Sequence, residues 1–224
     1  MSRSEYPLCL LKGHLYIQVE GELWLIDTGA PGSFGTPGHV ELDDKQFEVP
    51  LELENLSASS LCDFVGVECA GLLGMEILGQ FDIGFELPGN KLIVSRDELS
   101  FNGAGERLME IHGLPIAQVR VGGSMHSMFF DTGAQFSYLN HAKVETYPHL
   151  GRVEDFHPEI GMFWADMFLI PCKFGTLEFK MNVGRPPDRI RQVLEACGVP
   201  GVFGNEALRQ RAWWYSSRRG VLVS

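Results

Sequence analysis

Residues 25–30 read LIDTGA, and residues 129–134 repeat this pattern as FFDTGA. Both copies contain Asp-Thr-Gly-Ala, and two apolar residues precede each of them. The chain has only five threonines, and two of them stand in these copies. From the composition, the expected number of Asp-Thr-Gly tripeptides is ~0.03, so chance does not explain two of them. The pattern indicates an internal duplication.

The similarity extends well beyond the two motifs. Upstream of each copy, the sequence reads as strand, turn and strand. Downstream, two apolar residues and a glycine precede a helix-compatible stretch, and each half then closes with an aromatic-rich hairpin. The matching segments are residues 16–26 and 117–130, GLLGMEIL at 71–78 and GVFGNEAL at 201–208, and KLIVS at 91–95 and GVLVS at 220–224. The duplication therefore covers nearly the whole chain.

Size and composition agree with two small folded units. A chain of 224 residues corresponds to one large domain or two small ones, and 45% hydrophobic residues are enough for a sizeable core. This composition excludes a disordered, collagen-like or low-complexity chain. A polar, glycine-containing stretch near residues 100–106 separates the repeats. We therefore expect an N-terminal lobe of residues 1–100 and a C-terminal lobe of residues 101–224.

The two lobes are expected to be mainly β. Most predicted strands are short and rich in β-branched or aromatic residues, and Gly, Pro and Asn separate them. The best helix candidate runs from Asp188 to Cys197, with Pro187 before it and Gly198 and Pro200 after it.

Charge and hydropathy exclude several partners. Eighteen basic and 29 acidic side chains give a net charge of −11, which argues against binding to nucleic acid or to an anionic membrane surface. No segment approaches the ~18 apolar residues that a membrane span needs. The N-terminal apolar run, residues 7–11, is too brief for a secretory signal.

No metal or cofactor motif is present in the sequence. The five cysteines form no Cys-x-x-Cys pair, which predicts buried free thiols in a reducing cytoplasm. His141, His149 and His157 are spaced by eight and fit no zinc motif. A phosphate-binding loop and a dinucleotide fingerprint are missing too. We therefore expect a cytoplasmic protein that uses neither a metal nor a cofactor.

The duplicated aspartates, Asp27 and Asp131, are the strongest candidates for chemistry. A pseudo-twofold axis between two equivalent halves brings the same loop of each half face to face. Two carboxyls about 3 Å apart cannot both ionise, so they share one proton and titrate as a pair. Such a pair supplies a general base and a general acid at one place, with room for a water molecule.

At these residues the chain resembles the aspartic proteases. The DTGA motif, the later apolar-apolar-Gly motif and the ~110-residue unit are most similar to the retropepsins, in which two units, usually two chains, complete one active site. This sequence looks like two such units fused, and it also resembles the bilobal pepsins, which are far longer. The resemblance covers about residues 8–95 and 107–224. It implies a mainly β, bilobal, pseudo-twofold acid-protease fold built from two retropepsin-like lobes.

The resemblance also implies roles for the repeated residues. One aspartate would ionise and activate the water, while its protonated partner would polarise the scissile carbonyl; the sequence leaves open which is which. The threonines would form hydroxyl hydrogen bonds between the lobes, and the later glycines would lie behind the catalytic loops. The residues concerned are Asp27, Thr28, Gly29 and Ala30, their counterparts Asp131, Thr132, Gly133 and Ala134, and Gly74 and Gly204.

The two repeats differ in one segment. Asp27 and Gly74 are 47 positions apart, whereas Asp131 and Gly204 are 73 apart, and the 26 extra residues fall between positions 137 and 168. This segment reads as a β-hairpin rimmed with aromatic residues. We expect it to be a flap over the cleft, with Ile160, Gly161 and Met162 nearest to the substrate, and we expect no flap in the N-terminal lobe. The alternative is a surface hairpin that packs on its own lobe.

The residue after each Asp-Thr-Gly affects the pH at which we expect activity. Ala30 and Ala134 stand where the pepsins have a serine that hydrogen-bonds the carboxylate. Loss of a donor to the charged form removes one influence that lowers the pKa of the pair. The sequence therefore predicts activity at mildly acidic pH.

The sequence thus predicts an aspartic endopeptidase that hydrolyses peptide bonds of a peptide or an unfolded protein. Because one chain supplies both aspartates, we expect a monomer. Two alternatives stay open: a non-catalytic peptide-binding or scaffold protein on the same fold, and a homodimer that exchanges lobes.

Overall fold

The computed structural model describes residues 3–101, 103, 105–158 and 160–224. Strands dominate, which confirms the mainly β prediction. The N-terminal half contains β1 (Ser4–Leu11), β2 (His14–Val19), β3 (Glu22–Ile26), β4 (Phe34–Gly35), β5 (His39–Leu42), β6 (Lys45–Glu48), β7 (Glu52–Leu53), β8 (Leu56–Ser57), α1 (Ala58–Val65), β9 (Gly71–Leu73), α2 (Met75–Leu78), β10 (Asp82–Glu86), η1 (Leu87–Gly89) and β11 (Lys91–Ser95).

The C-terminal half repeats much of this order. It contains β12 (Gly105–Arg107), β13 (Met109–Ile111), β14 (Leu114–Val121), β15 (Ser124–Phe130), β16 (Ser137–Leu139), η2 (Ala142–Thr146), β17 (His149–His157), β18 (Gly161–Phe174), β19 (Leu177–Gly184), α3 (Asp188–Ala196), β20 (Gly201–Phe203), η3 (Asn205–Arg209), β21 (Trp213–Ser216) and β22 (Val221–Val223). The predicted helix is thus α3, and it begins and ends within one residue of the expected positions. Among the described residues, no helix has the length and apolar character needed to cross a bilayer.

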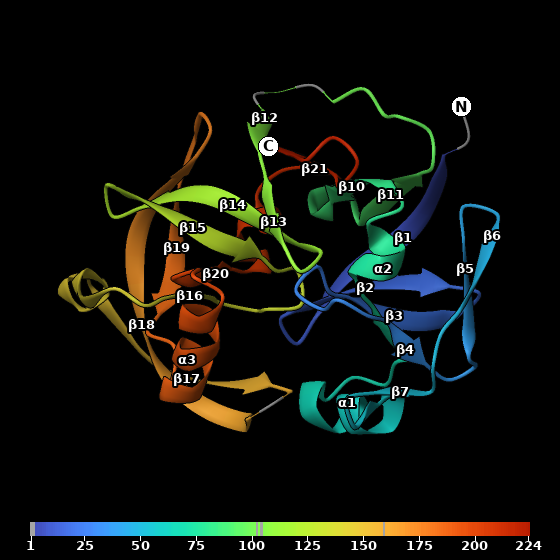
Figure 1. The fold of residues 1–224 in the computed structure, drawn as a ribbon, viewed down its shortest axis with the longest axis horizontal. Coiled ribbons are helices and arrows are strands. Elements are labelled where there is room, and N and C mark those ends of the chain that lie inside the picture. Colours follow the sequence, from blue (N-terminus) through green and yellow to red (C-terminus); the bar gives the residue numbers. More distant parts are fainter. Residues whose placement is uncertain (1–2, 102, 104, 159) are drawn as a thin grey trace.

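Two large sheets organise the chain (Figure 1). One has ten strands in the order β12-β22-β21-β10-β11-β1-β2-β3-β9-β4, and the other has eight in the order β13-β14-β15-β20-β16-β19-β18-β17. The ten-stranded sheet spans both halves, because β12, β21 and β22 come from the C-terminal half. Smaller hairpins, β5–β6 and β7–β8, complete the N-terminal half.

The pairing of β10 with β21 is symmetric about one residue pair. Gly84 pairs with Trp214, and each lies ten residues after the glycine of its repeat, Gly74 or Gly204. A Cβ atom on Gly84 would overlap the Trp214 ring, so only glycine lets the two strands meet here. Equivalent residues of the two repeats therefore lie at equivalent places on either side of this pair.

Each half repeats one local arrangement of three strands. In the N-terminal half β3 pairs in parallel with β9, which pairs antiparallel with β4; in the C-terminal half β15, β20 and β16 do the same. The chain leaves β3 and β15 at Asp27 and Asp131. This repeated arrangement positions the two sequence motifs equivalently.

The main core is continuous between the halves. Large aromatic side chains from both halves fill it, and β10, β11, β21 and β22 lie at its centre. Fully buried members include Phe81, Phe85, Phe130, Phe203, Trp213 and Tyr215. Two smaller apolar clusters lie under α1 and α3, one in each half. Helix α1 was not predicted; it begins with a capping box formed by Ser57 and Ser60, and Gly66 ends it in the left-handed conformation.

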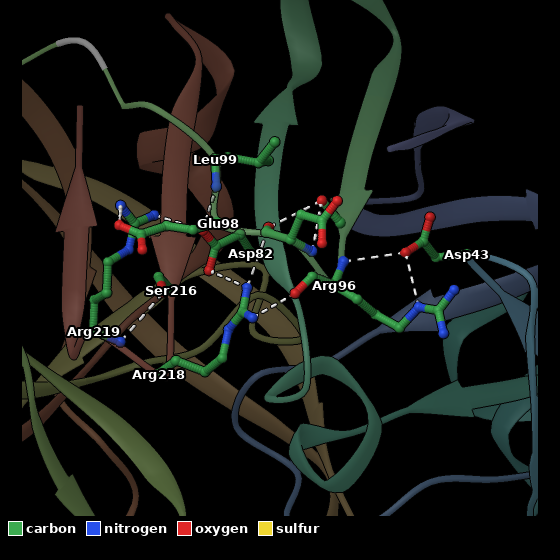
Figure 2. Close-up of polar contacts among 10 residues, drawn as sticks. Asp43, Asp82, Arg96, Glu98, Leu99, Ser216, Arg218 and Arg219 are labelled. Atoms are coloured by element: carbon green, nitrogen blue, oxygen red, sulfur yellow. Dashed lines mark hydrogen bonds and ion pairs between the residues drawn. The ribbon is translucent and has the colours of Figure 1, made fainter. Parts of the chain in front are cut away.

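A buried ion cluster joins the two halves (Figure 2). Asp82 of β10 is fully buried, and it accepts hydrogen bonds from Arg218 Nη2 at 3.0 Å, Arg219 Nη2 at 2.6 Å and the Leu99 backbone N–H at 2.8 Å. The two arginines come from the turn between β21 and β22. A buried carboxylate needs such charge-assisted partners, so this cluster fixes the N-terminal β10 against the C-terminal hairpin. Close by, Arg96 holds the buried Asp43 within the N-terminal half.

Candidate active site

The two Asp-Thr-Gly loops start in the same way. The backbone N–H of Asp27 donates to Leu73 O of β9 at 3.0 Å, and that of Asp131 donates to Phe203 O of β20 at 3.0 Å. Each aspartate is therefore held at the end of a buried strand by the parallel strand beside it. Both aspartates are half-buried residues.

Thr28 and Thr132 join the two loops by four reciprocal hydrogen bonds. Thr28 Oγ1 accepts from the Thr132 N–H at 3.0 Å, and Thr132 Oγ1 accepts from the Thr28 N–H at 3.0 Å. Each hydroxyl also donates across the interface, Thr28 to Phe130 O at 2.6 Å and Thr132 to Ile26 O at 2.9 Å. Both side chains are fully buried, so the backbone groups have no solvent to replace these partners. The two loops are thus fixed face to face.

The glycines of the motifs let the carboxyls approach. A Cβ atom on Gly29 would overlap the Asp131 carboxyl, and a Cβ atom on Gly133 would overlap the Asp27 carboxyl. The two carboxyls are in hydrogen-bond contact with each other. Asp27 Oδ1 also accepts from the Gly29 N–H at 2.8 Å, and Asp131 Oδ1 accepts from the Ala134 N–H at 2.9 Å.

The pKa of each carboxyl is raised, but not equally. Burial, followed by the charge of Asp131, raises the pKa of Asp27 well above its usual value. Burial also raises the pKa of Asp131, but the Ala134 N–H, the hydrogen bond from Asp27 and the charge of His157 all favour its ionised form. Because the two carboxyls are in contact and both are buried, they titrate as a pair that shares one proton.

Gly74 and Gly204 lie directly behind the loops. The Gly74 N–H donates to Ser33 Oγ at 2.7 Å, and the Gly204 N–H donates to Ser137 Oγ at 3.0 Å. A Cβ atom on either glycine would overlap carbonyl oxygens of its loop, those of residues 30 and 32 or those of residues 134 and 136. The close approach explains why a glycine stands at both positions.

Ser33 and Ser137 were missed in the sequence. Each lies six residues after its aspartate, and each is fully or almost fully buried with its hydroxyl on the glycine behind the loop. The signal was available, because the two serines occupy equivalent positions of the repeat. The duplicated set of loop residues therefore includes one serine in each half.

Two further polar residues have no equivalent in the other half. Asn205 donates through Nδ2 to Thr132 O at 3.2 Å and to Gly13 O at 2.9 Å, whereas its counterpart Met75 packs in the core. His14 Nδ1 lies 2.9 Å from Gly133 O. Both residues connect the second loop to the start of β2 in the N-terminal half. No repeat pattern could have identified them.

The 26-residue surplus forms the expected hairpin, β17–β18, which runs toward α1 of the N-terminal half (Figure 1). The Phe156 ring stacks on the Phe64 ring of α1, with centroids 4.0 Å apart and an angle of 16° between the planes. Ile160 packs beside the apolar cluster of its own half, while Met162 is about half exposed. The hairpin therefore packs on its own half and also reaches the other. Of the expected turn, Glu159 lies outside the described residues.

The cysteines do not form a metal site. All five are free, and only Cys172 is buried, so the prediction of buried thiols is wrong for the four others, which are half-buried. The closest pair is Cys62 and Cys69, with sulfurs 3.7 Å apart. In the part of the chain that the structure describes, no three His, Cys, Asp or Glu side chains are grouped to hold a metal ion.

Comparison of the sequence with models of known protein families gives no match, and comparison with curated proteins gives none either. The chemical interpretation of the site therefore rests on its geometry.

Proposed function

We propose that this chain is an aspartic endopeptidase that hydrolyses peptide bonds of a peptide or an unfolded protein. Its halves are two retropepsin-like lobes of a bilobal, pseudo-twofold acid-protease fold. The observation that carries the proposal is the pair of carboxyls, Asp27 and Asp131, held in contact by the reciprocal bonds of Thr28 and Thr132. Because one chain supplies both loops, we propose a monomeric enzyme.

We propose that Asp27, whose pKa is raised by burial and by the charge of Asp131, holds the shared proton, and that Asp131 is ionised. The ionised Asp131 removes a proton from a water molecule held between the carboxyls, and the water oxygen attacks the carbonyl carbon of the substrate. Asp27 donates its proton to the carbonyl oxygen, which gives a neutral tetrahedral intermediate. When the C–N bond breaks, Asp131 passes its proton to the leaving nitrogen and Asp27 regains a proton from the intermediate. The pair then holds one proton again.

The β17–β18 hairpin supports a covered peptide site. It extends from the C-terminal half to Phe64 of the N-terminal half. The charge of His157 on this hairpin lowers the pKa of Asp131, and the charge of Asp131 raises the pKa of Asp155 on the same hairpin. We propose that it is the single flap, that Ile160, Gly161 and Met162 at its turn face the substrate, and that the N-terminal half has none. A lone flap gives the two ends of a bound peptide different surroundings.

The test is the replacement of each aspartate by its neutral isostere. Asp27→Asn and Asp131→Asn should each reduce cleavage of an unfolded protein by roughly 10³-fold or more, because members of one catalytic unit fail together. Asp63→Asn, on the exposed face of α1, is the matched control and should cleave as the parent does. A peptide library digested across pH 3–8 supplies the substrate for all four proteins.

Two results would contradict the proposal. Cleavage that survives either active-site substitution would show that the pair is not the catalyst. The parent protein could instead bind peptides, release them when a statine-type transition-state mimic competes, and yet cleave none. That result would favour the non-catalytic peptide-binding protein.

The pH profile offers a second check. Burial raises the pKa of both carboxyls, and Ala30 and Ala134 contribute no hydroxyl that would lower it. The acid limb follows ionisation of Asp131 and the alkaline limb follows loss of the Asp27 proton. We expect an optimum above about pH 4, the usual value for an aspartate. An optimum below about 3 would contradict this reasoning, since it is typical of a pair with unraised values.

A further inference from the structure

Asp155 is a buried carboxyl that the proposed reaction does not use. It lies on β17 near the turn of the hairpin, and only 8% of its surface is exposed. The side chains around it are apolar: Tyr138, Ala165 and Met167 form a buried cluster with Phe136, Val153, Phe163 and Val202. A carboxyl in such surroundings is stable only if its oxygens are hydrogen-bonded.

Both oxygens of Asp155 have a partner. Tyr138 Oη donates to Asp155 Oδ2 at 2.6 Å, and the Phe156 N–H donates to Oδ1 at 2.8 Å. Tyr138 stands on β16 directly after Ser137, the serine that binds Gly204 behind the second catalytic loop. The Tyr138–Asp155 bond therefore ties the hairpin to the frame that positions Asp131.

The repeat provides an internal comparison. Tyr138 lies seven residues after Asp131, and the residue seven after Asp27 is Phe34, a buried member of the apolar cluster under α1. The hydroxyl is thus found only in the half that has the long hairpin. A tyrosine that served only to fill the core would need no hydroxyl, as Phe34 shows.

Neighbouring residues of the strand connect the two halves. Residues next to one another on a strand point to opposite faces, so Asp155 turns toward β16 of its own half. Phe156 stacks on Phe64 of α1 in the other half. Fixing Asp155 therefore fixes the direction in which Phe156 crosses between the halves.

Charged groups near Asp155 come from both halves. His14 from β2 favours the ionised form, while Asp131 disfavours it. Burial has the largest influence and raises the pKa of Asp155, against the hydrogen bonds from Tyr138 and Phe156. These interactions place Asp155 within electrostatic range of the catalytic pair.

We propose that Tyr138 and Asp155 form a latch that holds the β17–β18 hairpin closed beside the aspartate pair, and that both are positioning residues for substrate binding. The proposal about substrate rests on the proposed function, whereas the latch itself is a property of the free protein. A peptide must displace the hairpin to enter, and the latch sets how completely the hairpin returns over it.

Hydrogen exchange of the free protein tests the latch without any catalysis. Tyr138→Phe and Asp155→Ala should each speed exchange at residues 149–168 by roughly 10-fold or more, because local opening becomes easier. Tyr147→Phe is the matched control: its hydroxyl donates to Gly122 O in the same half, and its loss should leave residues 149–168 unchanged. Asp166→Asn, an exposed acid on the same hairpin, controls for charge.

If Tyr138→Phe or Asp155→Ala folds poorly, Asp155→Asn serves as a further variant for the hydrogen-exchange test. Its amide can still bond to Tyr138, so exchange should rise less than in Asp155→Ala. The double variant Tyr138→Phe/Asp155→Ala should exchange no faster than either single variant, because both break the same bond. Exchange at the parent rate in Tyr138→Phe and Asp155→Ala, or fully additive effects in the double variant, would overturn the latch.

Cleavage kinetics then test its role for substrate. Tyr138→Phe should raise KM roughly 10-fold and change kcat much less, since closure over the peptide becomes less favourable while the aspartates stay in place. Faster exchange in a protein whose parent form cleaves no peptide would support the latch and contradict the endopeptidase. A fall in kcat with unchanged KM would overturn the positioning role.

Discussion

The two halves of the molecule build the same loop and surround it differently. In the N-terminal half, 47 positions separate Asp27 from Gly74, and the only long hairpin in between is β5–β6 with four-residue strands. In the C-terminal half, 73 positions separate Asp131 from Gly204 and include β17–β18, with strands of nine and 14 residues.

The difference separates two kinds of requirement. Residues that build the two loops are duplicated: aspartate, threonine, glycine and the serine behind each loop occur in both halves. The long hairpin and its partner Tyr138, which we propose to cover the site, occur once. A pair of carboxyls held face to face needs similar support from both loops, whereas the long hairpin has no such requirement to be repeated.

The largest expected effect concerns the junction between the halves, which is not symmetric. Asp82 binds Arg218 and Arg219, but the position equivalent to Asp82 in the second repeat is Ala212. Asp82→Ala should lower the free energy of unfolding by about 3 kcal/mol, because Arg218, Arg219 and the Leu99 N–H all lose this buried acceptor. Urea unfolding followed by tryptophan fluorescence measures this.

Asp166→Ala is the control for this cluster. Asp166 pairs with His149 at the surface, so its removal should change stability by less than about 1 kcal/mol. Equal effects of the two substitutions would show that the Asp82 cluster does not hold the halves together.

A second prediction tests whether the loops are energetically equivalent. Thr28→Val and Thr132→Val should each lower the free energy of unfolding by about 2–3 kcal/mol, since each leaves a buried N–H and a buried carbonyl without a partner. Thr146→Val, at an exposed site, should have little effect. Clearly unequal losses of stability in the Thr28 and Thr132 variants would show that the two loops are not energetically equivalent.

A third prediction concerns the contact of the hairpin with α1. Phe156→Ala and Phe64→Ala should be coupled by about 0.5–1.5 kcal/mol in a double-mutant cycle of stability, because both remove one aromatic stack. Trp164→Ala, whose side chain is about half exposed on the same hairpin, should show no coupling to Phe64→Ala. Zero coupling between Phe156 and Phe64 would mean that the hairpin is not held by α1.

The smallest expected effect is a gain in stability. The folded protein raises the pKa of Asp27 above its unfolded value, so folding is opposed once the pH exceeds the unfolded pKa, and this opposition vanishes at lower pH. Asp27→Asn should therefore raise the free energy of unfolding by about 1 kcal/mol at pH 7 and by less at pH 4. Asp131→Asn should also gain stability, because burial raises the pKa of Asp131 as well.

Unfolding measured at both pH values checks this. A larger gain at pH 4 than at pH 7 would contradict the sign of the shift. A larger gain in the free energy of unfolding for Asp131→Asn than for Asp27→Asn would contradict the proposal that Asp27 holds the shared proton.

Repeated and local features were predictable from the sequence. The mainly β class, the duplication, helix α3 and the hairpin in the surplus segment follow from patterns within a few residues or between equivalent positions. Ser33 and Ser137 belong to this group as well, because alignment of the repeats would have found them. Such features are fixed by backbone preferences and by the alternation of apolar residues, which any short window of sequence displays.

Only the tertiary structure decided the contacts that occur once. Asn205 and His14 on the second loop, the arginines on Asp82, the Phe64–Phe156 stack and the Tyr138–Asp155 bond each join residues without an equivalent in the other repeat. The raised pKa of both aspartates likewise depends on burial, which is set by packing. The sequence by itself thus determined the two equivalent loops, because their residues are repeated, whereas packing decided what makes the halves unequal, because burial and long-range contacts have no local signal.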